Sequence, residues 1–152
     1  MTVYQSLAKW LDGLFADPEN GFPSNLAVIT DVELVPNPGN ENNPGYEIQN
    51  SGLFSNPNDQ HVQMLGGQYR HVEFKTWYLV RRFASRGERV STEDFLGKIR
   101  LAIRRATRLG TMPGDGRRWR KIEVNGGIFP SRKSDDNTSA VYQIPLRIEY
   151  VE

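Results

Sequence analysis

The most regular pattern in the chain is the alternation of apolar and polar side chains over residues 140–151. Its apolar positions, each two residues from the next, are Ala140, Tyr142, Ile144, Leu146, Ile148 and Tyr150. Because successive side chains of a strand point to opposite faces, this period of two predicts a strand with one buried face. Pro145 lacks an amide hydrogen, which predicts an edge strand or a bulge. We expect either an ordinary outer strand or an edge that a neighbouring subunit covers near Arg147.

Two other stretches alternate in the same way. Residues 27–35 are the first expected strand, and residues 69–83 are the longest one, which follows a hairpin turn at the Gly-Gly pair 66–67. The buried face of the long strand is expected to carry Val72, Phe74, Thr76, Tyr78 and Val80. Trp77 and Leu79 lie on the opposite face, so that face needs a local cover, either a helix or another chain.

Apolar side chains recur every three or four positions in two segments, which is the period of a helix. Residues 3–15 form the first expected helix, with Thr2 as its N-cap. Residues 91–109 form the second, which begins at Ser91 and stops at Gly110. The apolar stripe of the second helix consists of Phe95, Ile99, Ala102, Ile103, Ala106 and Leu109.

Residues 36–59 are rich in asparagine, proline and glycine, which predicts a long loop. Loops of this length inside a compact domain are usually functional or disordered. A plain disordered insertion is one interpretation. We favour a binding loop, because a solvated linker has no need of apolar side chains such as those of Tyr46, Ile48, Leu53 and Phe54.

The C-terminal part contains an expected strand over residues 119–124, a Gly-Gly interruption at 126–127 and a polar hairpin loop over 130–139. The order of elements is therefore helix, strand, long loop, long hairpin, helix, strand, strand. Clustered strands with two helices laid on them describe an α+β fold, with a largely antiparallel sheet flanked by two main helices. At 152 residues we expect a single domain over 1–152.

The composition and the absence of known motifs exclude several kinds of functional site. The chain has no cysteine, which excludes disulfides and thiolate metal sites, and it has no phosphate-binding loop, dinucleotide fingerprint or zinc-protease motif. The histidines, His61 and His71, flank the hairpin turn and can come close in space, but no spacing supplies a third metal ligand. We therefore expect no enzymatic activity, no cofactor and no metal. The lack of a signal peptide or an apolar span predicts a soluble protein made in a cytoplasm.

The charge is unevenly distributed along the chain. Residues 1–76 hold three basic and nine acidic side chains, whereas residues 77–152 hold sixteen basic and nine acidic ones. The densest basic run consists of Lys98, Arg100, Arg104, Arg105, Arg108, Arg117, Arg118, Arg120 and Lys121. The preference for arginine favours bidentate contacts to phosphates or carboxylates. Two interpretations stay open, a surface that binds a nucleic-acid backbone or complementary surfaces that meet in a head-to-tail assembly.

Together these features resemble the tail terminator, or tail completion, proteins of long-tailed bacteriophages, which are also described as minor tail proteins. The resemblance is carried by the helix over 3–15, the Thr-Trp-Tyr-Leu-Val segment at 76–80, the capped helix start at 92–99 and the closing strand at 142–150. It covers most of the chain as a layout of elements. It implies an α+β subunit of a hexameric ring that caps the tail tube, stops its polymerisation and provides the attachment surface for the head connector.

The resemblance also implies partners and a location. The expected partners are other copies of the chain, the major tail tube protein, the head-tail connector protein and, non-specifically, DNA passing through the ring. The expected location is the head-proximal end of the tail in the virion. The candidate interface residues are Tyr46, Ile48, Leu53, Phe54, Trp77, Arg104, Arg105, Arg108, Arg117, Arg118 and Arg147. Two alternatives remain, another head-tail connector or neck protein and a small basic nucleic-acid-binding module.

Overall fold

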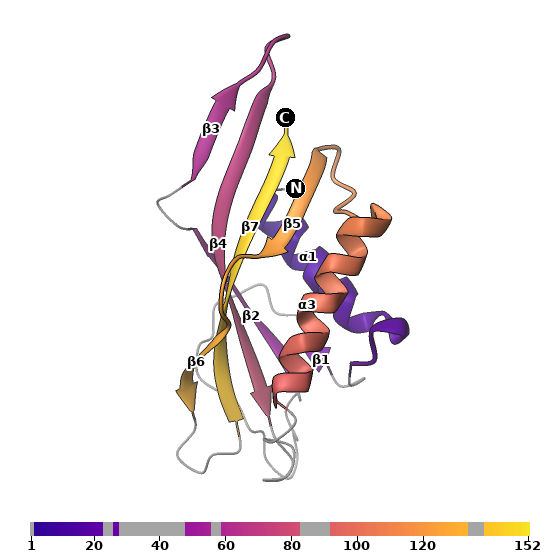
Figure 1. The fold of residues 1–152 in the computed structure, drawn as a ribbon, viewed down its shortest axis with the longest axis vertical. Coiled ribbons are helices and arrows are strands. Elements are labelled where there is room, and N and C mark those ends of the chain that lie inside the picture. Colours follow the sequence, from indigo (N-terminus) through magenta and orange to yellow (C-terminus); the bar gives the residue numbers. More distant parts are fainter. Residues whose placement is uncertain (1, 23–25, 28–47, 56–58, 83–91, 134–138) are drawn as a thin grey trace.

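The computed structural model describes residues 2–22, 26–27, 48–55, 59–82, 92–133 and 139–152 (Figure 1). Its helices are α1 (Val3–Ala16), the short 3-10 helix η1 (Pro18–Asn20) and α3 (Thr92–Leu109). Its strands are β1 (Leu26–Ala27), β2 (Ile48–Ser55), β3 (Gln60–Gln63), β4 (Tyr69–Arg82), β5 (Arg118–Val124), β6 (Phe129–Lys133) and β7 (Ser139–Val151).

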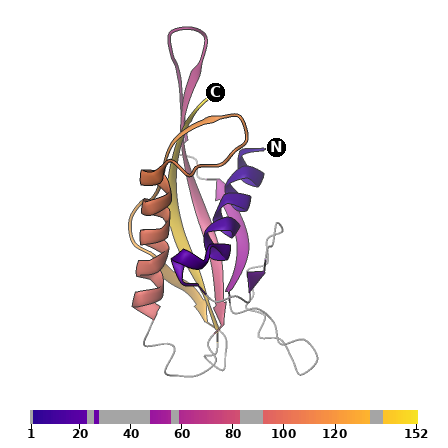
Figure 2. The same cartoon turned by 90° about the vertical axis from the view of Figure 1, so that its right-hand side faces the viewer.

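The strands form one seven-stranded sheet in the order β1-β2-β4-β7-β5, in which β3 also pairs with β4 and β6 with β7. Among the described strands, β1 and β2 are parallel and the other neighbours are antiparallel. Both α1 and α3 lie on the same face of the sheet, as Figures 1 and 2 show from two directions. The fold is therefore α+β with a largely antiparallel sheet, which confirms the prediction from the sequence.

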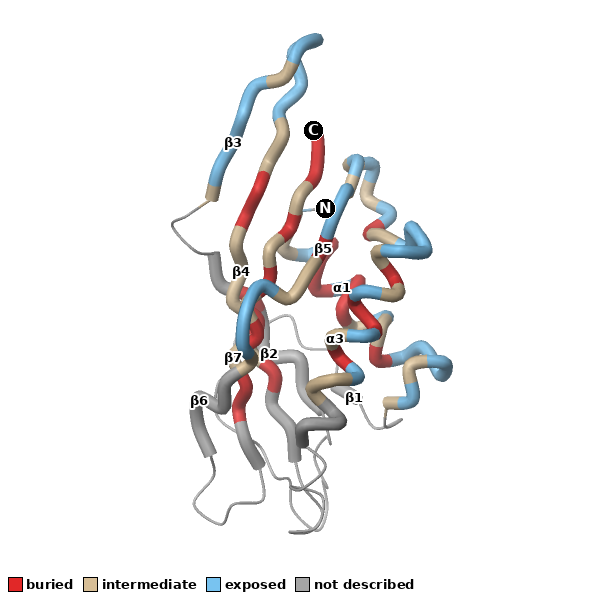
Figure 3. Tube along the Cα trace, viewed as in Figure 1, coloured by how far each residue is buried: buried red, intermediate tan, exposed pale blue. Residues whose placement is uncertain are grey.

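The core lies between the two helices and the sheet, where the buried segments gather (Figure 3). Its most deeply buried side chains are Leu7, Leu11, Trp77, Leu79, Ile99, Ile103, Ile122, Ile144, Leu146 and Ile148. On β7 the buried positions alternate as predicted from Tyr142 to Tyr150, whereas Val141 and Val151 on the other face are buried as well. Burying each of these side chains contributes roughly 1.5–3 kcal/mol to stability. Strand β7 therefore supplies much of the apolar surface that the sheet buries in the core.

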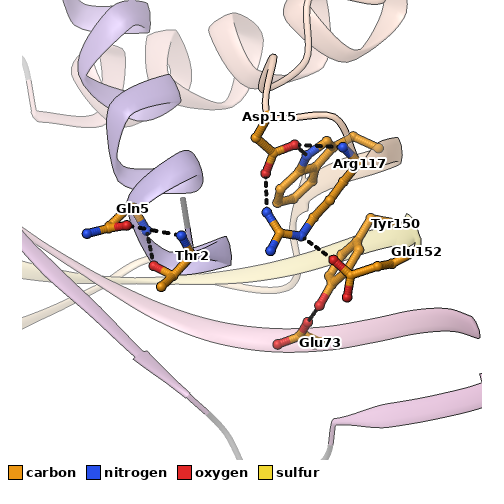
Figure 4. Close-up of polar contacts among 8 residues, drawn as sticks. Thr2, Gln5, Glu73, Asp115, Arg117, Tyr150 and Glu152 are labelled. Carbon is orange, nitrogen blue, oxygen red and sulfur yellow. Dashed lines mark hydrogen bonds and ion pairs between the residues drawn. The ribbon is translucent and has the colours of Figure 1, made fainter.

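Both long helices form where the sequence predicted them. At the start of α1, the backbone N–H of Gln5 donates to the Thr2 hydroxyl at 3.1 Å, and the Gln5 side chain accepts from the Thr2 backbone at 3.0 Å (Figure 4). Helix α3 ends at Gly110, whose φ of +73° is the left-handed conformation that glycine adopts without strain. Leu109 is 62% exposed, so its assignment to the buried stripe is wrong. It is the last residue of the helix, where Gly110 turns the chain away. The expected N-cap, Ser91, lies outside the described residues.

The prediction for the faces of β4 is wrong in part, because the core lies on the face of Trp77 and Leu79, although Val72 on the other face is also buried. Trp77 and Leu79 are 1% and 0% exposed and belong to the core, whereas Phe74 on the other face is half-buried. Trp77 lies opposite Ile144 of β7, and the ring of Phe15 of α1 packs against it with the centroids 5.7 Å apart. The sequence required a cover over Trp77, and the cover is a helix of the same chain.

Pro145 does not mark a sheet edge, because β7 pairs with β4 along one side and with β5 and β6 along the other. The ladder with β5 ends at Leu146, and the ladder with β6 begins at Gln143. Asn125 donates its backbone N–H to the Pro145 carbonyl at 2.8 Å. In an antiparallel strand the nitrogen and the carbonyl of one residue lie on the same side. The Pro145 nitrogen, which has no hydrogen to donate, therefore lies in the interval between the two ladders. The edge prediction is wrong, and β7 has no free edge near Pro145 at which another subunit could pair.

The predicted long loop over residues 36–59 is wrong for residues 48–55, which form β2 against β4. A register shift between Asn50 and Leu53 breaks the alternation of this strand. The sequence therefore shows no sustained period there. The other residues of the predicted loop, up to residue 58, lie outside the described part of the chain.

Two further boundaries differ from the prediction. The expected hairpin loop over 130–139 contains β6 as far as Lys133, because a proline and a register shift within β6 hide its alternation. Of the expected strand over 27–35, Ala27 belongs to β1 and residues 28–35 lie outside the described residues.

Candidate functional site

A groove with a cationic lining lies between α3 and β5. Its volume is about 340 Å³, and it is lined by Arg100, Ile103, Arg104, Thr107, Arg108, Lys121, Ile122, Glu123 and Val124. Arg100, Arg104 and Arg108 are four residues apart and so follow one side of the helix. At 1.5 Å of rise per residue, their Cα atoms are spaced about 6 Å along the helix axis. The groove can therefore bind an elongated anion along its length.

Two of the groove arginines are available for such a ligand. Arg104 and Arg108 are exposed, and neither makes a hydrogen bond or ion pair within the described part of the chain. Arg100 donates from Nη2 to the Gly126 carbonyl at 2.6 Å. Arg118, at the first position of β5, is exposed as well. Of the predicted basic cluster, Arg104 and Arg108 have the strongest case as binding residues.

Other members of the basic run hold the chain together. Arg105 forms an ion pair with Glu19 of η1 and reaches the Asn20 side chain at 3.5 Å. Lys98 donates to the Gly21 carbonyl at 3.4 Å. These contacts join α3 to the segment that follows α1, so the basic run does not form one free surface.

Arg147 is also engaged within the chain. Its guanidinium lies 3.4 Å from Glu123 of β5 and 3.7 Å from Glu149 of β7. Glu149 in turn pairs with Arg70 of β4 at 2.7 Å, and Lys121 pairs with Glu123 at 3.1 Å. Partly exposed pairs of this kind each contribute about 0–1 kcal/mol. The charges form a ladder across three strands, and Arg147 is part of it.

The apolar residues predicted for an interface are placed differently from the expectation. Leu53 is 6% exposed and Trp77 is 1% exposed, and both belong to the core between sheet and helices. Their assignment to a surface is wrong, because β2 and β4 direct them toward α1. Tyr46 lies outside the described residues. Ile48 and Phe54 belong to β2, but their side chains lie outside the described part of the structure.

A polar cluster that the sequence analysis missed fixes the segment before β5 onto the end of the sheet (Figure 4). The Asp115 side chain, 2% exposed, accepts from Trp119 Nε1 at 2.8 Å, from the Arg117 backbone at 3.1 Å and from Arg117 Nη1 at 2.6 Å. Arg117 also donates from Nε to Glu152 at 2.8 Å. Arg117, predicted as an interface residue, therefore ties the Asp115 turn to the last residue of the chain.

Glu73 is a buried carboxylate beside this cluster, with 8% of its surface exposed. It accepts hydrogen bonds from the Tyr150 hydroxyl and, at 2.9 Å, from Lys75 Nζ. Burial acts to raise the pKa of Glu73, but the hydrogen bonds from Tyr150 and Lys75 outweigh it and hold the pKa below its usual value. Burial and the neighbouring Glu73 both raise the pKa of Tyr150. At neutral pH, Glu73 is therefore charged and Tyr150 is neutral.

Asp115→Asn should lower the free energy of unfolding by about 1.5–3 kcal/mol at neutral pH, which is typical for hydrogen bonds to a charged group. Burial acts to raise the pKa of Asp115, but the donors Trp119 and Arg117 hold it well below its usual range. The carboxylate therefore contributes its full stability above the ordinary aspartate pKa of about 3.9, and this contribution is lost as the pH falls below that value. Urea denaturation at a series of pH values measures the difference.

Asp17→Asn is the matched control for this exchange. Asp17 is exposed and accepts from the Glu19 backbone N–H at 3.0 Å, a cap that asparagine also provides. We expect its unfolding free energy to stay within about 0.5 kcal/mol of the wild type, as for other surface exchanges. Equal losses in the two variants, or an Asp115→Asn loss that does not shrink in acid, would contradict this account of Asp115.

The β3–β4 hairpin projects beyond the rest of the sheet, and we call it the hairpin arm (Figures 1 and 2). All four residues of β3 are exposed, as the colouring of Figure 3 shows. At the tip, Leu65 is 101% exposed, and Val62 and Tyr69 are 51% and 44% exposed. Gly66 and Gly67 have φ of +87° and +77°, which the reversal requires and other residues rarely adopt. The arm thus presents apolar side chains that the described part of the chain leaves uncovered.

A second hollow, of about 390 Å³, lies between α1 and the segment over residues 111–115. Its lining combines the apolar side chains of Trp10, Leu14, Met112 and Pro113 with Lys9 and Asp17. Trp10 Nε1 donates to the Thr111 carbonyl at 2.7 Å and holds this segment against the helix. The side chains that line the hollow are therefore mainly apolar.

Sequence reasoning found the turn of the hairpin arm but missed its exposed apolar side chains, and it missed the Asp115 cluster, although both leave a signal. Leu65 is an apolar residue directly before a Gly-Gly turn, where a polar residue is usual. Asp115 stands between two glycines, and an aspartate in such a turn commonly accepts from the backbone two residues further on.

Comparison with known proteins adds no family to these observations. No protein-family model matches the chain, and no curated protein is similar to it in sequence. In the described part of the chain, no helix is long and apolar enough to cross a membrane. Nor do three or more histidine, aspartate or glutamate side chains come together there in a way that could hold a metal ion. A functional proposal therefore depends on the residues and their geometry.

Proposed function

We propose that the chain is a structural subunit of a long-tailed phage, a tail terminator that forms a hexameric ring. The ring caps the tail tube, stops its polymerisation and offers a surface to the head connector. The order of an N-terminal helix, a long strand, a second helix and a closing strand supports this proposal. The role is structural, without catalysis or a cofactor, and is carried out at the head-proximal end of the tail.

The observation that carries the proposal is the hairpin arm. Leu65 is fully exposed at the end of a projection, and covering a side chain of this size contributes roughly 1.5–3 kcal/mol. We therefore take Leu65, with Val62 and Tyr69 beside it, as the contact surface of the arm. The arm belongs to β3 and β4, whereas the two hollows belong to α1, α3, β5 and the segment over 111–115. A contact between the arm of one copy and a hollow of another joins unlike surfaces and is therefore heterologous. Heterologous contacts that close generate rings.

Sedimentation and pull-down measurements test the proposal. Tag-free protein is expected to sediment as an oligomer whose population rises with concentration, and to be captured by tail tube protein. A strict monomer that tail tube protein does not capture would contradict it. Capture by a portal or head-completion protein, without capture by tube protein, would favour another head-tail connector or neck protein instead.

The groove between α3 and β5 favours a second candidate function, the binding of a nucleic-acid backbone such as DNA that passes through the ring. Arg104 and Arg108 supply exposed guanidinium groups along one line, and Lys121 of β5, which pairs with Glu123, lies beside them. Phosphates are bound by such groups without regard to base sequence. An acidic segment of another protein is the other ligand that this charge distribution fits.

Arg104→Glu should weaken the binding of double-stranded DNA and reduce the slope of log K against log salt by about 1. Lys9→Glu makes the same change of charge at an exposed position of α1 and should leave the slope nearly unchanged. Fluorescence anisotropy at several salt concentrations measures both. If the wild type does not bind DNA, or binds it equally well at every salt concentration, DNA is not a ligand of the groove.

A further inference from the structure

The hairpin arm brings the two histidines of the chain together. His61 of β3 and His71 of β4 are directly opposite one another in the antiparallel register. Their Nδ1 atoms face each other at 2.5 Å, and their ring centroids are 4.8 Å apart. We propose that this pair binds a divalent transition-metal ion such as Zn²⁺, with both Nδ1 atoms as ligands and water completing the coordination.

The free pair is arranged so that an ion can replace a proton. Two Nδ1 atoms at this distance accommodate one hydrogen between them, so one ring donates and the other accepts. A metal ion binds the lone pairs of both nitrogens, and the ring that carried the hydrogen on Nδ1 carries it on Nε2 instead. In a tetrahedral zinc site, bonds of 2.0–2.1 Å place two nitrogens about 3.3 Å apart. Binding therefore requires the rings to separate by about 0.8 Å from their 2.5 Å contact.

One ligand is fixed and the other can adapt. The ring of His71 stacks on Tyr150 at a centroid distance of 4.8 Å and lies 6.2 Å from the ring of Tyr69. His61 is exposed on a strand of which every residue is exposed, so its side chain can rotate outward by the required amount. An imidazole pair suits Zn²⁺, Ni²⁺ or Cu²⁺, whereas Mg²⁺ and Ca²⁺ prefer oxygen ligands.

The surrounding charge suits a cation. Glu73 lies two residues beyond His71 on the same face of β4, and its charge interacts with His61. Its two oxygens are already engaged by Tyr150 and Lys75, so Glu73 offsets the positive charge of the ion without serving as a third ligand. The chain has only these two histidines and no cysteine, so every imidazole ligand of a bound ion must come from this pair.

A bound ion would join the two strands of the arm. Within the described sheet, β3 is an edge strand that pairs with β4 alone, whereas β4 also pairs with β7 at Arg70, His71 and Val72. The ion would fix the register of the arm from Gln60 to Tyr69 and so stiffen it. This inference does not depend on the proposed ring, since a monomer contains the whole site.

Calorimetric titration of tag-free protein with ZnCl₂ tests the inference. We expect saturable binding of one ion per chain and a rise in Tm of roughly 5–10 °C when free zinc reaches a hundred times Kd. His61→Gln and His71→Gln should each abolish this binding. Gln63→Ala, at an exposed position of the same strand, should leave it unchanged. Titration with MgCl₂ should produce no heat of binding.

Two outcomes would overturn the inference. One is a wild type that does not bind zinc, or that responds equally to magnesium. The other is binding that persists in either histidine variant. Imidazole ¹⁵N spectra of the wild type provide a second measurement that does not depend on the variants' folding. The Nδ1 resonances of both histidines should move together as zinc is added, and a titration in which they stay in place would equally refute the site.

Discussion

Replacing Trp77 with alanine should lower the free energy of unfolding by about 3–5 kcal/mol. The indole is 1% exposed at the middle of β4, opposite Ile144 of β7 and Leu53 of β2, and packs against Phe15 of α1. Because its neighbours belong to three other elements, a shift of any one of them cannot fill the cavity that the exchange leaves. Urea denaturation at a protein concentration low enough to give monomers measures the loss.

Thr76→Ala is the control, because Thr76 is the preceding residue of β4 and points to the half-buried face of the sheet. We expect Thr76→Ala to lower the free energy of unfolding by less than about 1 kcal/mol, the centre of the range for single exchanges. A Trp77→Ala monomer as stable as the wild type, with impaired self-association, would restore the interface role that the sequence alone suggested for Trp77.

Leu65→Asp should reduce self-association by at least about 30-fold, the equivalent of a 2 kcal/mol contact residue. Leu65 is 101% exposed at the tip of the hairpin arm, so a charge there leaves the folded monomer unaffected but is costly to bury in an interface. Sedimentation equilibrium gives the association constant. Thermal unfolding of the dilute monomer confirms that the variant is folded.

The matched control is Gln68→Asp, which places the same charge at an exposed, polar position of the same turn. We expect it to weaken self-association by less than about 5-fold, since rim charges of an interface contribute little. If both variants associate as the wild type does, the arm is not a contact between copies, even if rings form through another surface.

Much of the fold is predictable because its elements satisfy local rules. Strand β7 alternates from Tyr142 to Tyr150, and α1 combines an apolar stripe with a Thr2 cap, so pattern and chain geometry agree. The Gly-Gly turn of the hairpin arm is found for the same reason. In each case the information lies within a few residues of the element that it specifies.

The errors arise where tertiary partners decide. Strand β2 loses its alternation at a bulge, and the position of Pro145 depends on where β5 ends and β6 begins. On β4 both faces carry aromatic and aliphatic side chains, so the sequence does not show which face the helices cover. That choice becomes visible only when Phe15 of α1 meets Trp77.

The candidate site was predictable in part. The arginine repeat at positions 100, 104 and 108 marks one side of a helix, and this side lines the groove. The sequence does not reveal that Arg105 and Arg117 are engaged by Glu19 and Asp115, because these partners become neighbours only through folding. Charge counting therefore overestimated the free basic surface, and it did not point to the hairpin arm at all.

Electron microscopy of the purified, tag-free protein tests most directly the claim that this chain closes into a ring. We expect closed rings that increase with concentration, rings seated at one end of tail tubes when tube protein is added, and neither for Leu65→Asp. Monomers at every concentration, together with tubes that remain uncapped in the presence of the protein, would contradict it.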